Sequence, residues 1–392
     1  MPTVASGIVD TETVLADERV VDMEDKFRLL DPDTSQFMTI LNKLPSKTAT
    51  REKVNWLEDE LFPNLTTIGT SATSAATTLA VATDTGTYFR AGDLVRVGST
   101  GEMIEVSSIS SDTLTIVRSV GGVAAQSAQS GVDLVIVGNA AAQGADYGTL
   151  KVTKRVLGYN YTQIFRHPFG FTNTDVEIET YGPGQLTHEV AKKAVEHKRA
   201  LENSSFWGAR DFTSQAPSSK GYMGGIYEFL STNVFTGAGN IDLAYIDGKL
   251  QSIFQHGSLR KVIFAAPTPA AALSKLFADR WVRAKPSDSV YGAKVNSFIN
   301  GAYGESVPVI VKREWGKRQG TGLQNGGLMF VLDLDYVKLR PMRNRGTKLL
   351  RNRQGNGVDS TVHEYLTEIS MEVSQEKAHG LIQGITGASA VA

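Results

Sequence analysis

The sequence predicts a mixed α+β fold that carries an all-β insertion, and three observations support this prediction. Short alternating strands separated by turns fill residues 64–140. One long amphipathic helix follows over residues 185–206. Beyond residue 220, helical and strand patterns alternate, as they do in an α/β unit with a central sheet.

Composition narrows the class of protein before any motif is considered. The chain has 392 residues, enough for about two or three packed domains. Its 40 basic and 41 acidic residues leave a net charge of -1, which argues against a chain that is basic throughout and coats nucleic acid. Cysteine is absent, so disulfides, Cys-zinc sites, iron–sulfur clusters and cysteine nucleophiles are excluded.

The two ends and the hydropathy predict a soluble protein made in a cytoplasm. The N-terminus shows no basic region followed by an apolar core, so we expect no signal peptide. No stretch reaches the roughly 18–20 apolar residues of a membrane span. Residues 385–392 are small and weakly polar, which predicts a loose C-terminal tail.

The first 60 residues are expected to form an extended, partly helical arm. A short amphipathic helix is predicted over residues 22–30, because its apolar residues share one face. A second helix is predicted over residues 33–44, with Thr34 or Ser35 as its N-cap and Pro45 as its stop.

Residues 64–140 predict a compact module of four or five strands, either a small barrel or a long twisted hairpin. The module contains no histidine and only three basic residues, which equips it poorly for catalysis. A structural or contact role is therefore expected. The clearest strand candidates are residues 93–97, 102–106, 113–117 and 132–137.

The remaining elements follow from periodicity. An aromatic run over residues 159–171 predicts an extended segment, and the helix over residues 185–206 would be about 30 Å long. Helices are also predicted over residues 243–255 and after Pro269, the latter carrying Leu273, Leu276, Phe277 and Trp281. Further strands are predicted over residues 261–265, 307–311, 328–332, 335–340 and 361–373.

The histidines of the long helix invite a metal-site interpretation, which their spacing disfavours. A zincin helix needs two histidines four residues apart, so that both rings face one metal. His188 and His197 are nine apart and point to opposite sides of the helix. We therefore expect them to be solvated or to lie at an interface.

Three further motifs resemble catalytic or ligand sites only loosely. Ser258 and Lys261 match the S-x-x-K spelling of a serine acyl-enzyme, but no partner motif is present. The glycine-rich stretch at 221–225 lacks the phosphate-loop ending. Asp333 and Asp335 could bind a cation together, although acids at a strand end are usually solvated. No enzyme emerges from these residues.

Charge is distributed unevenly along the chain. Residues 1–60 carry 7 basic and 13 acidic side chains, whereas residues 310–353 carry 11 and 3. The plain interpretation is a set of solvated faces; the alternative is that acidic and basic stretches meet between copies of the chain. The basic stretch 338–353 could also contact nucleic acid, but it has no interleaved aromatic residue for base stacking.

Several stretches, in their order along the chain, carry a resemblance to a known family. They are LDPDTSQFMTILNKL (30–44), VNWLEDELFPN (54–64), residues 92–122, YNYTQIFRHPFGFTNTDVEIETYG (159–182), THEVAKKAVEHKRALENSSFWG (187–208) and TEISMEVSQEKAHGLIQGI (367–385). Together they resemble the arm, loop, β-rich insertion, return strand, spine helix and closing strand of major head proteins of tailed bacteriophages. No single motif is diagnostic, and the ordered set carries the resemblance.

The resemblance implies the Hong Kong 97-type capsid fold. Its parts would be an N-terminal arm (1–50), an extended loop (51–158) with a β-rich insertion (about 64–140), a peripheral domain with the spine helix (159–219), an axial α/β domain (220–330), and a return to the peripheral domain with a C-terminal tail (331–392). The Lys–Asn cross-link of some members cannot be matched to residues of this chain.

The implied function is structural and non-enzymatic, with no cofactor. Copies of the chain would assemble into pentamers and hexamers of an icosahedral shell around phage double-stranded DNA, in the host cytoplasm, and remain in the virion. Portal, scaffolding and decoration proteins are candidate partners, packaged DNA would be touched only weakly, and no membrane is involved. We expect contacts between subunits at Trp56, Glu58, Asp59, Glu60, Arg343, Arg345, Arg351 and Arg353.

Two alternatives stay open on the sequence alone. An encapsulin-type nanocompartment shell has the same fold but houses an enzyme cargo. A hydrolase with an appended carbohydrate-binding β module is a different class, and it would need a catalytic pair that the sequence does not display.

Overall fold

The structure, a computed structural model, describes residues 35–144, 148, 150–178, 185–214, 218–276, 281–282, 296–299, 306–317 and 326–389. It divides into two units, residues 57–157 and the rest of the chain. Each unit has a hydrophobic core of its own. The predicted helix over residues 22–30 lies outside the described residues.

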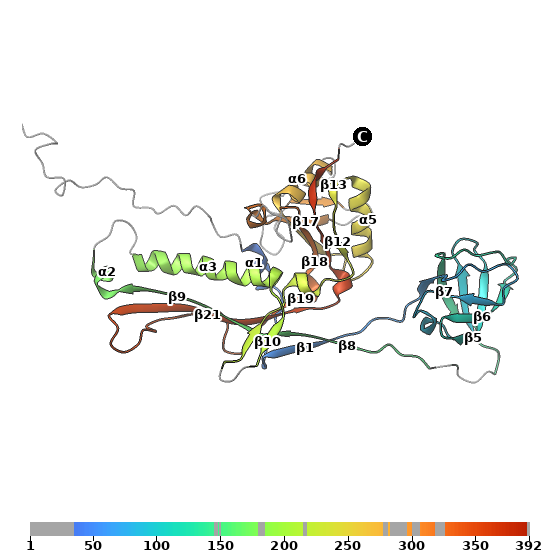
Figure 1. Cartoon of the computed structure of the whole chain (residues 1–392), viewed down its shortest axis with the longest axis horizontal. Coiled ribbons are helices and arrows are strands. Elements are labelled where there is room, and N and C mark those ends of the chain that lie inside the picture. The colour runs from blue at the N-terminus through green and yellow to red at the C-terminus, as the bar shows by residue number, and fades with distance from the viewer. Residues whose placement is uncertain are drawn as a thin grey trace, which may run out of the picture. The chain divides into compact units, whose positions relative to one another are not determined.

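The unit of residues 57–157 is built on a six-stranded antiparallel sheet that closes into a small barrel (Figure 1). The strand order is β2-β7-β4-β5-β6-β3, and a bridge between Ile68 and Val81 joins the two outer strands. Alternate residues such as Val95 and Ile104 fill its core, as period-two patterns require. The strands are β2 (Leu65–Thr67), β3 (Thr78–Ala80), β4 (Asp93–Val97), β5 (Met103–Ser110), β6 (Thr113–Val120) and β7 (Asp133–Asn139).

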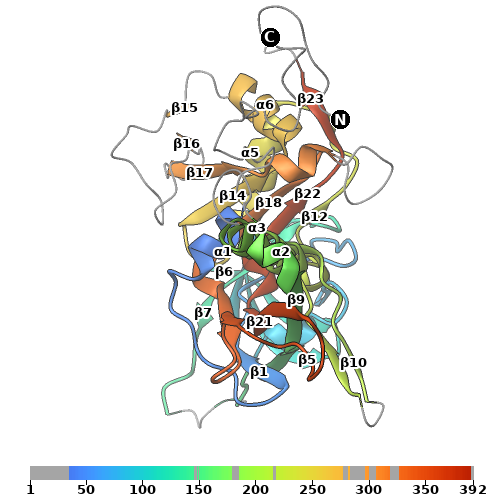
Figure 2. The same cartoon turned by 90° about the vertical axis from the view of Figure 1, so that its left-hand side faces the viewer.

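A mixed seven-stranded sheet organises the larger unit (Figure 2). Its central strand β14 (Lys261–Ala265) pairs parallel with β17 (Ser306–Val311) and antiparallel with β18 (Met329–Asp333). The outer strands are β12 (Val234–Phe235) and β22 (Gly380–Ile382) on one side and β16 (Asn296–Ile299) and β15 (Trp281–Val282) on the other.

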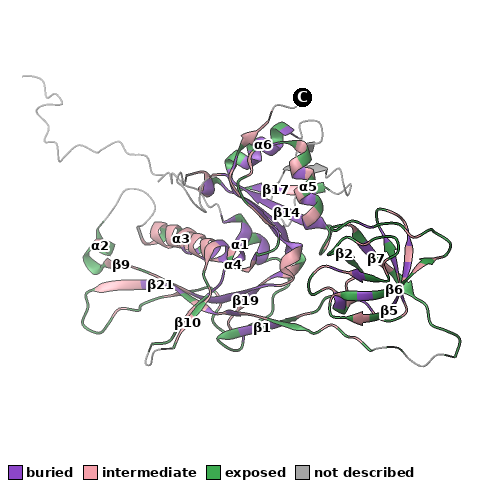
Figure 3. Cartoon of the chain, turned by 45° about the vertical axis from the view of Figure 1, so that its right-hand side comes forward, coloured by how far each residue is buried: buried purple, intermediate pink, exposed green. Residues whose placement is uncertain are grey.

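Both faces of this sheet are covered, which explains why β14 and β18 read as continuous apolar runs (Figure 3). Ile263 points to the face that packs on α5 (Leu243–Phe254) and α6 (Pro267–Leu276). Phe264 points to the opposite face, toward α1 (Gln36–Leu41). Asp242 begins α5 by accepting a 2.7 Å hydrogen bond from the N–H of Tyr245.

A second, elongated sheet runs beneath the long helix α3 (Gln185–Trp207) (Figure 1). Strand β21 (Ser360–Val373) pairs over ten residues with β9 (Gln163–Thr172), and along its other edge with β19 (Val337–Pro341) and β20 (Lys348–Leu350). The aromatic stretch around β9 therefore forms a strand, as predicted from its composition. The short helix α2 (Asn173–Glu177) follows β9.

Short elements complete the larger unit. Strand β1 (Lys53–Glu58) pairs with β8 (Val156–Tyr161), the two strands that lead into and out of residues 57–157. The other elements are β10 (Asp211–Thr213) with β11 (Lys220–Tyr222), β13 (Gly239–Ile241) with β23 (Ile385–Ala388), helix α4 (Ile226–Phe229) and the 3₁₀ turns η3 (Arg313–Lys317), η4 (Leu334–Tyr336) and η5 (Glu376–Ala378).

Three local predictions are corrected by the structure. The expected loose tail is wrong for residues 385–388, which form β23 and pair parallel with β13. Trp281 lies in strand β15 and not in the preceding helix, which ends at Leu276. Within the described part of the predicted range 33–44, the arm helix covers Gln36–Leu41 and its end tightens into i→i−3 bonds, from Lys43 to Ile40 and from Leu44 to Leu41.

Asn160 ties the outgoing strand β8 to two other parts of the larger unit, and its removal is expected to be costly. Its side-chain amide is fully buried, donates to the carbonyls of Met371 (2.7 Å) and Gly224 (3.0 Å), and accepts from the N–H groups of Gly224 and Tyr161 (2.8 Å each). Asn160→Ala leaves these buried groups unpaired, so we expect a loss of about 3 kcal/mol in urea unfolding. Asn160→Asp keeps the acceptor but turns a second carboxylate oxygen toward the carbonyls of Gly224 and Met371 in a buried site, so it should not recover the loss. Equal stability of all three proteins would contradict this.

Candidate assembly surfaces

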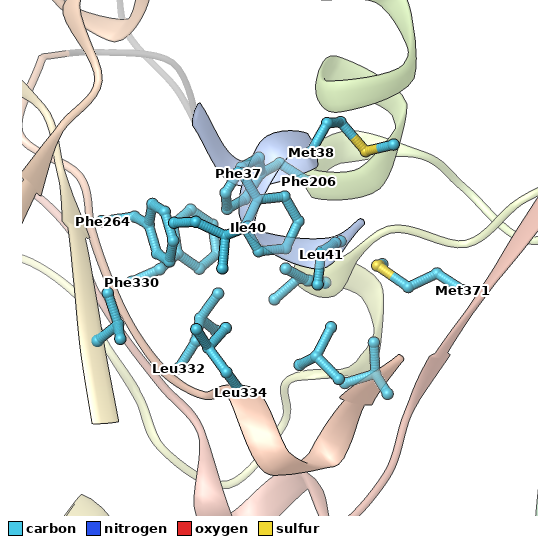
Figure 4. Close-up of a cluster of buried hydrophobic side chains, with 14 of the residues drawn as sticks. Phe37, Met38, Ile40, Leu41, Phe206, Phe264, Phe330, Leu332, Leu334 and Met371 are labelled. Atoms are coloured by element: carbon cyan, nitrogen blue, oxygen red, sulfur yellow. The ribbon is translucent and has the colours of Figure 1, made fainter. Parts of the chain in front are cut away.

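Helix α1 is the root of the N-terminal arm, and it is held by an aromatic socket (Figure 4). Phe37 is fully buried, with its ring 4.6 Å from that of Phe206 and 5.1 Å from that of Phe264. Ile40 and Leu41 are buried beside it. A six-residue helix is too short to be stable alone, so this packing is what orders it.

A buried carboxylate completes the attachment of α1. Glu202 of α3 accepts a 3.1 Å hydrogen bond from the N–H of Met38, and it also contacts the ammonium group of Lys312. A negative charge at the first turn of a helix satisfies free N–H groups and the helix dipole. Glu202 thus replaces the cap that Ser35 does not provide.

Of the two histidines of α3, His188 is half-buried and His197 is buried, so the expectation that both are solvated or at an interface is wrong for His197. His197 lies against the sheet, with its Nδ1 2.7 Å from Nδ1 of His167 and its Nε2 2.6 Å from the hydroxyl of Thr367. The Thr367 hydroxyl donates onward to Thr347, so it accepts from His197. Burial, reinforced by His167, lowers the pKa of His197 to about 4 and keeps the ring neutral.

The S-x-x-K residues converge on a buried aspartate. Lys261 donates to the carbonyls of His256 (2.9 Å) and Ala378 (2.7 Å) and lies 3.4 Å from Asp333. Ser258 gives Asp333 two hydrogen bonds, from its N–H (2.6 Å) and its hydroxyl (3.0 Å). Asp333 is therefore neither solvated nor available to a metal ion, and the Ser258 hydroxyl is bonded to Asp333 and not to the Lys261 amine that the S-x-x-K spelling would require as its base.

The predicted acidic contacts lie at the start of the smaller unit. Asp59 is 3.6 Å from Arg155 and accepts a 3.1 Å hydrogen bond from Thr153. Glu58 is half-buried and Glu60 is exposed. These carboxylates lie near the three most exposed large apolar side chains among the described residues: Leu61 (94% exposed), Leu150 (84%) and Val152 (86%).

A groove of about 740 Å³ is formed within the smaller unit beside these side chains, between residues 58–63, 87–88 and 150–156. Lys151 fixes the outgoing segment by donating to the carbonyl of Thr87 (2.9 Å), and Arg90 stacks over the ring of Phe62 at 5.2 Å. The apolar side chains carry no cover within the described chain.

Trp56 is placed differently from the other predicted contact residues. Its side chain is only 7% exposed and packs 5.9 Å from the ring of Phe229. Gly158 lies so close that a Cβ there would be 2.3 Å from the indole nitrogen. Most of its surface is therefore used within the chain.

The predicted basic contacts fall into two pairs on the elongated sheet. Arg343 is exposed in the turn after β19, and Arg345 forms an ion pair with the buried Glu368. Arg351 and Arg353 are exposed after β20. All four arginines lie in one basic stretch of the sequence, residues 338–353. Only the structure shows that Arg345, unlike the other three, forms an ion pair with the buried Glu368.

A cavity of about 420 Å³ lies between α1, α3 and the elongated sheet, and the sequence did not predict it. Its residues come from segments more than 300 positions apart, so no local pattern signals it. Among the described residues, no group of three or more His, Asp or Glu is arranged to hold a metal ion. No helix of the described chain is long and apolar enough to cross a membrane.

The sequence profile of one protein family matches nearly the whole chain. The family is described as SU10 major capsid protein, and the match covers residues 6–386. The chain belongs to this family. A search of curated proteins gives no significant match. The resemblance to major head proteins of tailed phages is thereby confirmed, and the protein is a structural shell protein.

A solved capsid structure shares the fold of this major capsid protein, and others resemble it more loosely. The capsid of the native GTA particle matches with a TM-score of 0.51 at 9% identity, covering 97% of this chain and 98% of that one. The capsid of Myoviridae phage XM1 gives 0.47 at 9% identity, covering 97% and 100%. The holo-SrpI encapsulin complex of Synechococcus elongatus PCC 7942 gives 0.44 at 12% identity, covering 61% and 81%.

Proposed function

We propose that this capsid protein closes into pentamers and hexamers of an icosahedral shell that encloses phage double-stranded DNA. The observation that carries the proposal is the row of exposed apolar side chains Leu61, Leu150 and Val152. Exposed side chains of this kind are normally buried against a partner. A second copy of the chain is the partner that every shell subunit has.

Within this shell, residues 51–158 would be the extended loop with its β-rich insertion, lying over a neighbouring subunit. Residues 220–330 would point toward the capsomer centre as the axial domain. The acidic residues Glu58 and Glu60 would meet the basic residues Arg351 and Arg353 of a neighbour. Complementary charges at such a contact set register and partner choice more than overall affinity.

Electron microscopy of the purified protein tests the proposal. Closed shells of one size, or isolated pentamers and hexamers, are the expected result. A protein that stays monomeric at high concentration and under crowding would overturn it. Shells that co-purify with one enzyme would favour the encapsulin-type alternative, and turnover of an ester or glycan would favour the hydrolase.

Reversing the charge of the exposed basic pair is expected to impair assembly. R351E/R353E should lower shell yield about tenfold, since like charges would then face each other at the contact. Arg345 is left intact because its loss would strand the buried Glu368. The added changes E58K/E60K should restore the yield, as measured by sedimentation of assembled particles. Unchanged yield in R351E/R353E, or no rescue, would contradict this pairing.

Other partners follow from the same proposal. The virion would be the final location, with assembly in the host cytoplasm. Portal, scaffolding and decoration proteins would bind the shell, and packaged DNA would touch it weakly and without sequence preference. The proposed role needs no cofactor and no catalytic residue.

A further inference from the structure

The cavity of about 420 Å³ beside α1 has an apolar floor, and exposed basic residues lie in the segments that edge it. Its floor is lined by Met38, Leu41, Leu201, Leu339 and Ile369. A floor of this kind stabilises an apolar guest by removing its surface from water. The cavity belongs entirely to the larger unit.

The edge of the cavity is lined by Lys198 and by five residues of two segments, 42–49 and 341–348: Asn42, Ser46, Pro341, Gly346 and Thr347. The two segments are joined where Ala49 bridges to Met342, and neither contains an acidic residue. Exposed basic side chains follow both segments and the adjacent turn of α3: Lys43, Lys47, Lys198, Arg343 and Lys348. Exposed basic side chains are therefore grouped near an apolar opening, which suits an anionic guest with apolar side chains.

We propose that this cavity is the docking site of the acidic N-terminal segment of the chain, residues 1–34. The segment carries nine acidic and three basic residues, and its apolar residues include Met23, Phe27 and Leu30. It joins the described chain at Ser35, directly before the helix that forms one wall of the cavity. The negative charge of residues 1–34, their apolar side chains and their attachment at Ser35 all suit a cavity with an apolar floor and basic residues nearby.

A nucleic acid fits the site less well. Phosphates would use the exposed basic residues, since clustered lysines and arginines bind a polyanion. The duplex backbone offers nothing that fills an apolar floor, whereas a peptide side chain does. The exposed basic residues near the cavity would thus bind the protein's own acidic segment, a role separate from shell formation.

Engineered cysteines test the proposal cleanly because the full chain contains none. Gly346 lies beside the cavity, and a Cβ there would meet no atom within 4 Å, so Gly346→Cys is tolerated. We expect the F27C/G346C protein to form a disulfide under mild oxidation about tenfold faster than a control pair, because docking raises the effective concentration. The matched control is F27C/G355C, whose Gly355 is similarly open.

The outcomes separate the proposal from its rivals. Adding K47E/K348E, or raising the salt concentration, should slow coupling of residues 27 and 346. Coupling in a mixture of the two single-cysteine proteins would place the segment of one copy on another; coupling only in the double variant would place it on its own chain. Equal rates for the two pairs would overturn the proposal. Normal shells that show no coupling of residues 27 and 346 would also overturn the proposal. If no coupling occurs and K47E/K348E no longer binds added duplex DNA, the basic residues bind DNA and the proposal is wrong.

Discussion

Replacing Phe37 with alanine is expected to lower the free energy of unfolding by about 3–5 kcal/mol. The ring is fully buried against Phe206 and Phe264, and it lies where α1 meets the seven-stranded sheet. Its removal leaves a cavity among rigid aromatic rings that cannot collapse to fill it. Urea unfolding followed by tryptophan fluorescence measures the loss directly.

A second consequence distinguishes this site from an ordinary core position. Because α1 has only six residues, it has no independent stability once its main anchor is removed. Limited proteolysis of Phe37→Ala should therefore cut within residues 35–50 before the rest of the larger unit unfolds. The matched control, Phe171→Ala at a half-buried ring on β9, should cost about 1 kcal/mol and leave this segment protected. Similar losses for the two variants would contradict the socket.

The sequence predicts best the helices and strands whose apolar residues form a regular pattern or an uninterrupted run. Strand β14 is buried on both faces, so its run Val262-Ile263-Phe264-Ala265 has no polar interruption to mislead the assignment. Helix α3 is long enough for its periodicity to be unambiguous. Strand β23 was missed because its small residues carry no pattern, and its pairing with β13 is more than 140 positions away in sequence.

Whether a polar residue is buried was harder to predict from the sequence than whether an apolar residue is buried. His197 and Asp333 resemble solvated residues in sequence, because a polar side chain is buried only when its partners are also buried. Those partners, Thr367 for His197 and Lys261 for Asp333, are distant in sequence and meet only after folding. The basic stretch is the converse case: its composition was evident, but only the tertiary structure shows that Arg345 neutralises Glu368.

Acid is expected to destabilise the subunit steeply between pH 6.5 and pH 4. Burial lowers the pKa of His197 and of His379 from 6.5 to about 4. In this window the unfolded chain binds more protons than the folded chain, so stability is fully present above pH 6.5 and is lost as the pH falls toward 4. Each ring contributes roughly 3 kcal/mol to this loss, by the free energy of a shift of this size.

The hydrogen bonds explain why neither ring can accept a proton without a rearrangement. Nδ1 of His379 accepts from the N–H of Asp333 at 3.1 Å, while its Nε2 donates to the carbonyl of Ser374. Nδ1 of His197 faces the ring of His167 in the same way. A proton added at either Nδ1 would point at an existing donor in a buried site.

Variants that keep one hydrogen bond but cannot be protonated test this directly. H197Q retains a donor toward Thr367, and H379N retains an acceptor for the N–H of Asp333. The double variant starts less stable at pH 7, but its urea midpoint should fall much less between pH 7 and pH 4 than that of the wild type. H256N, at an exposed histidine, should follow the wild type. If all three proteins lose the same stability over this range, the acid sensitivity has another origin and the two buried rings are not its source.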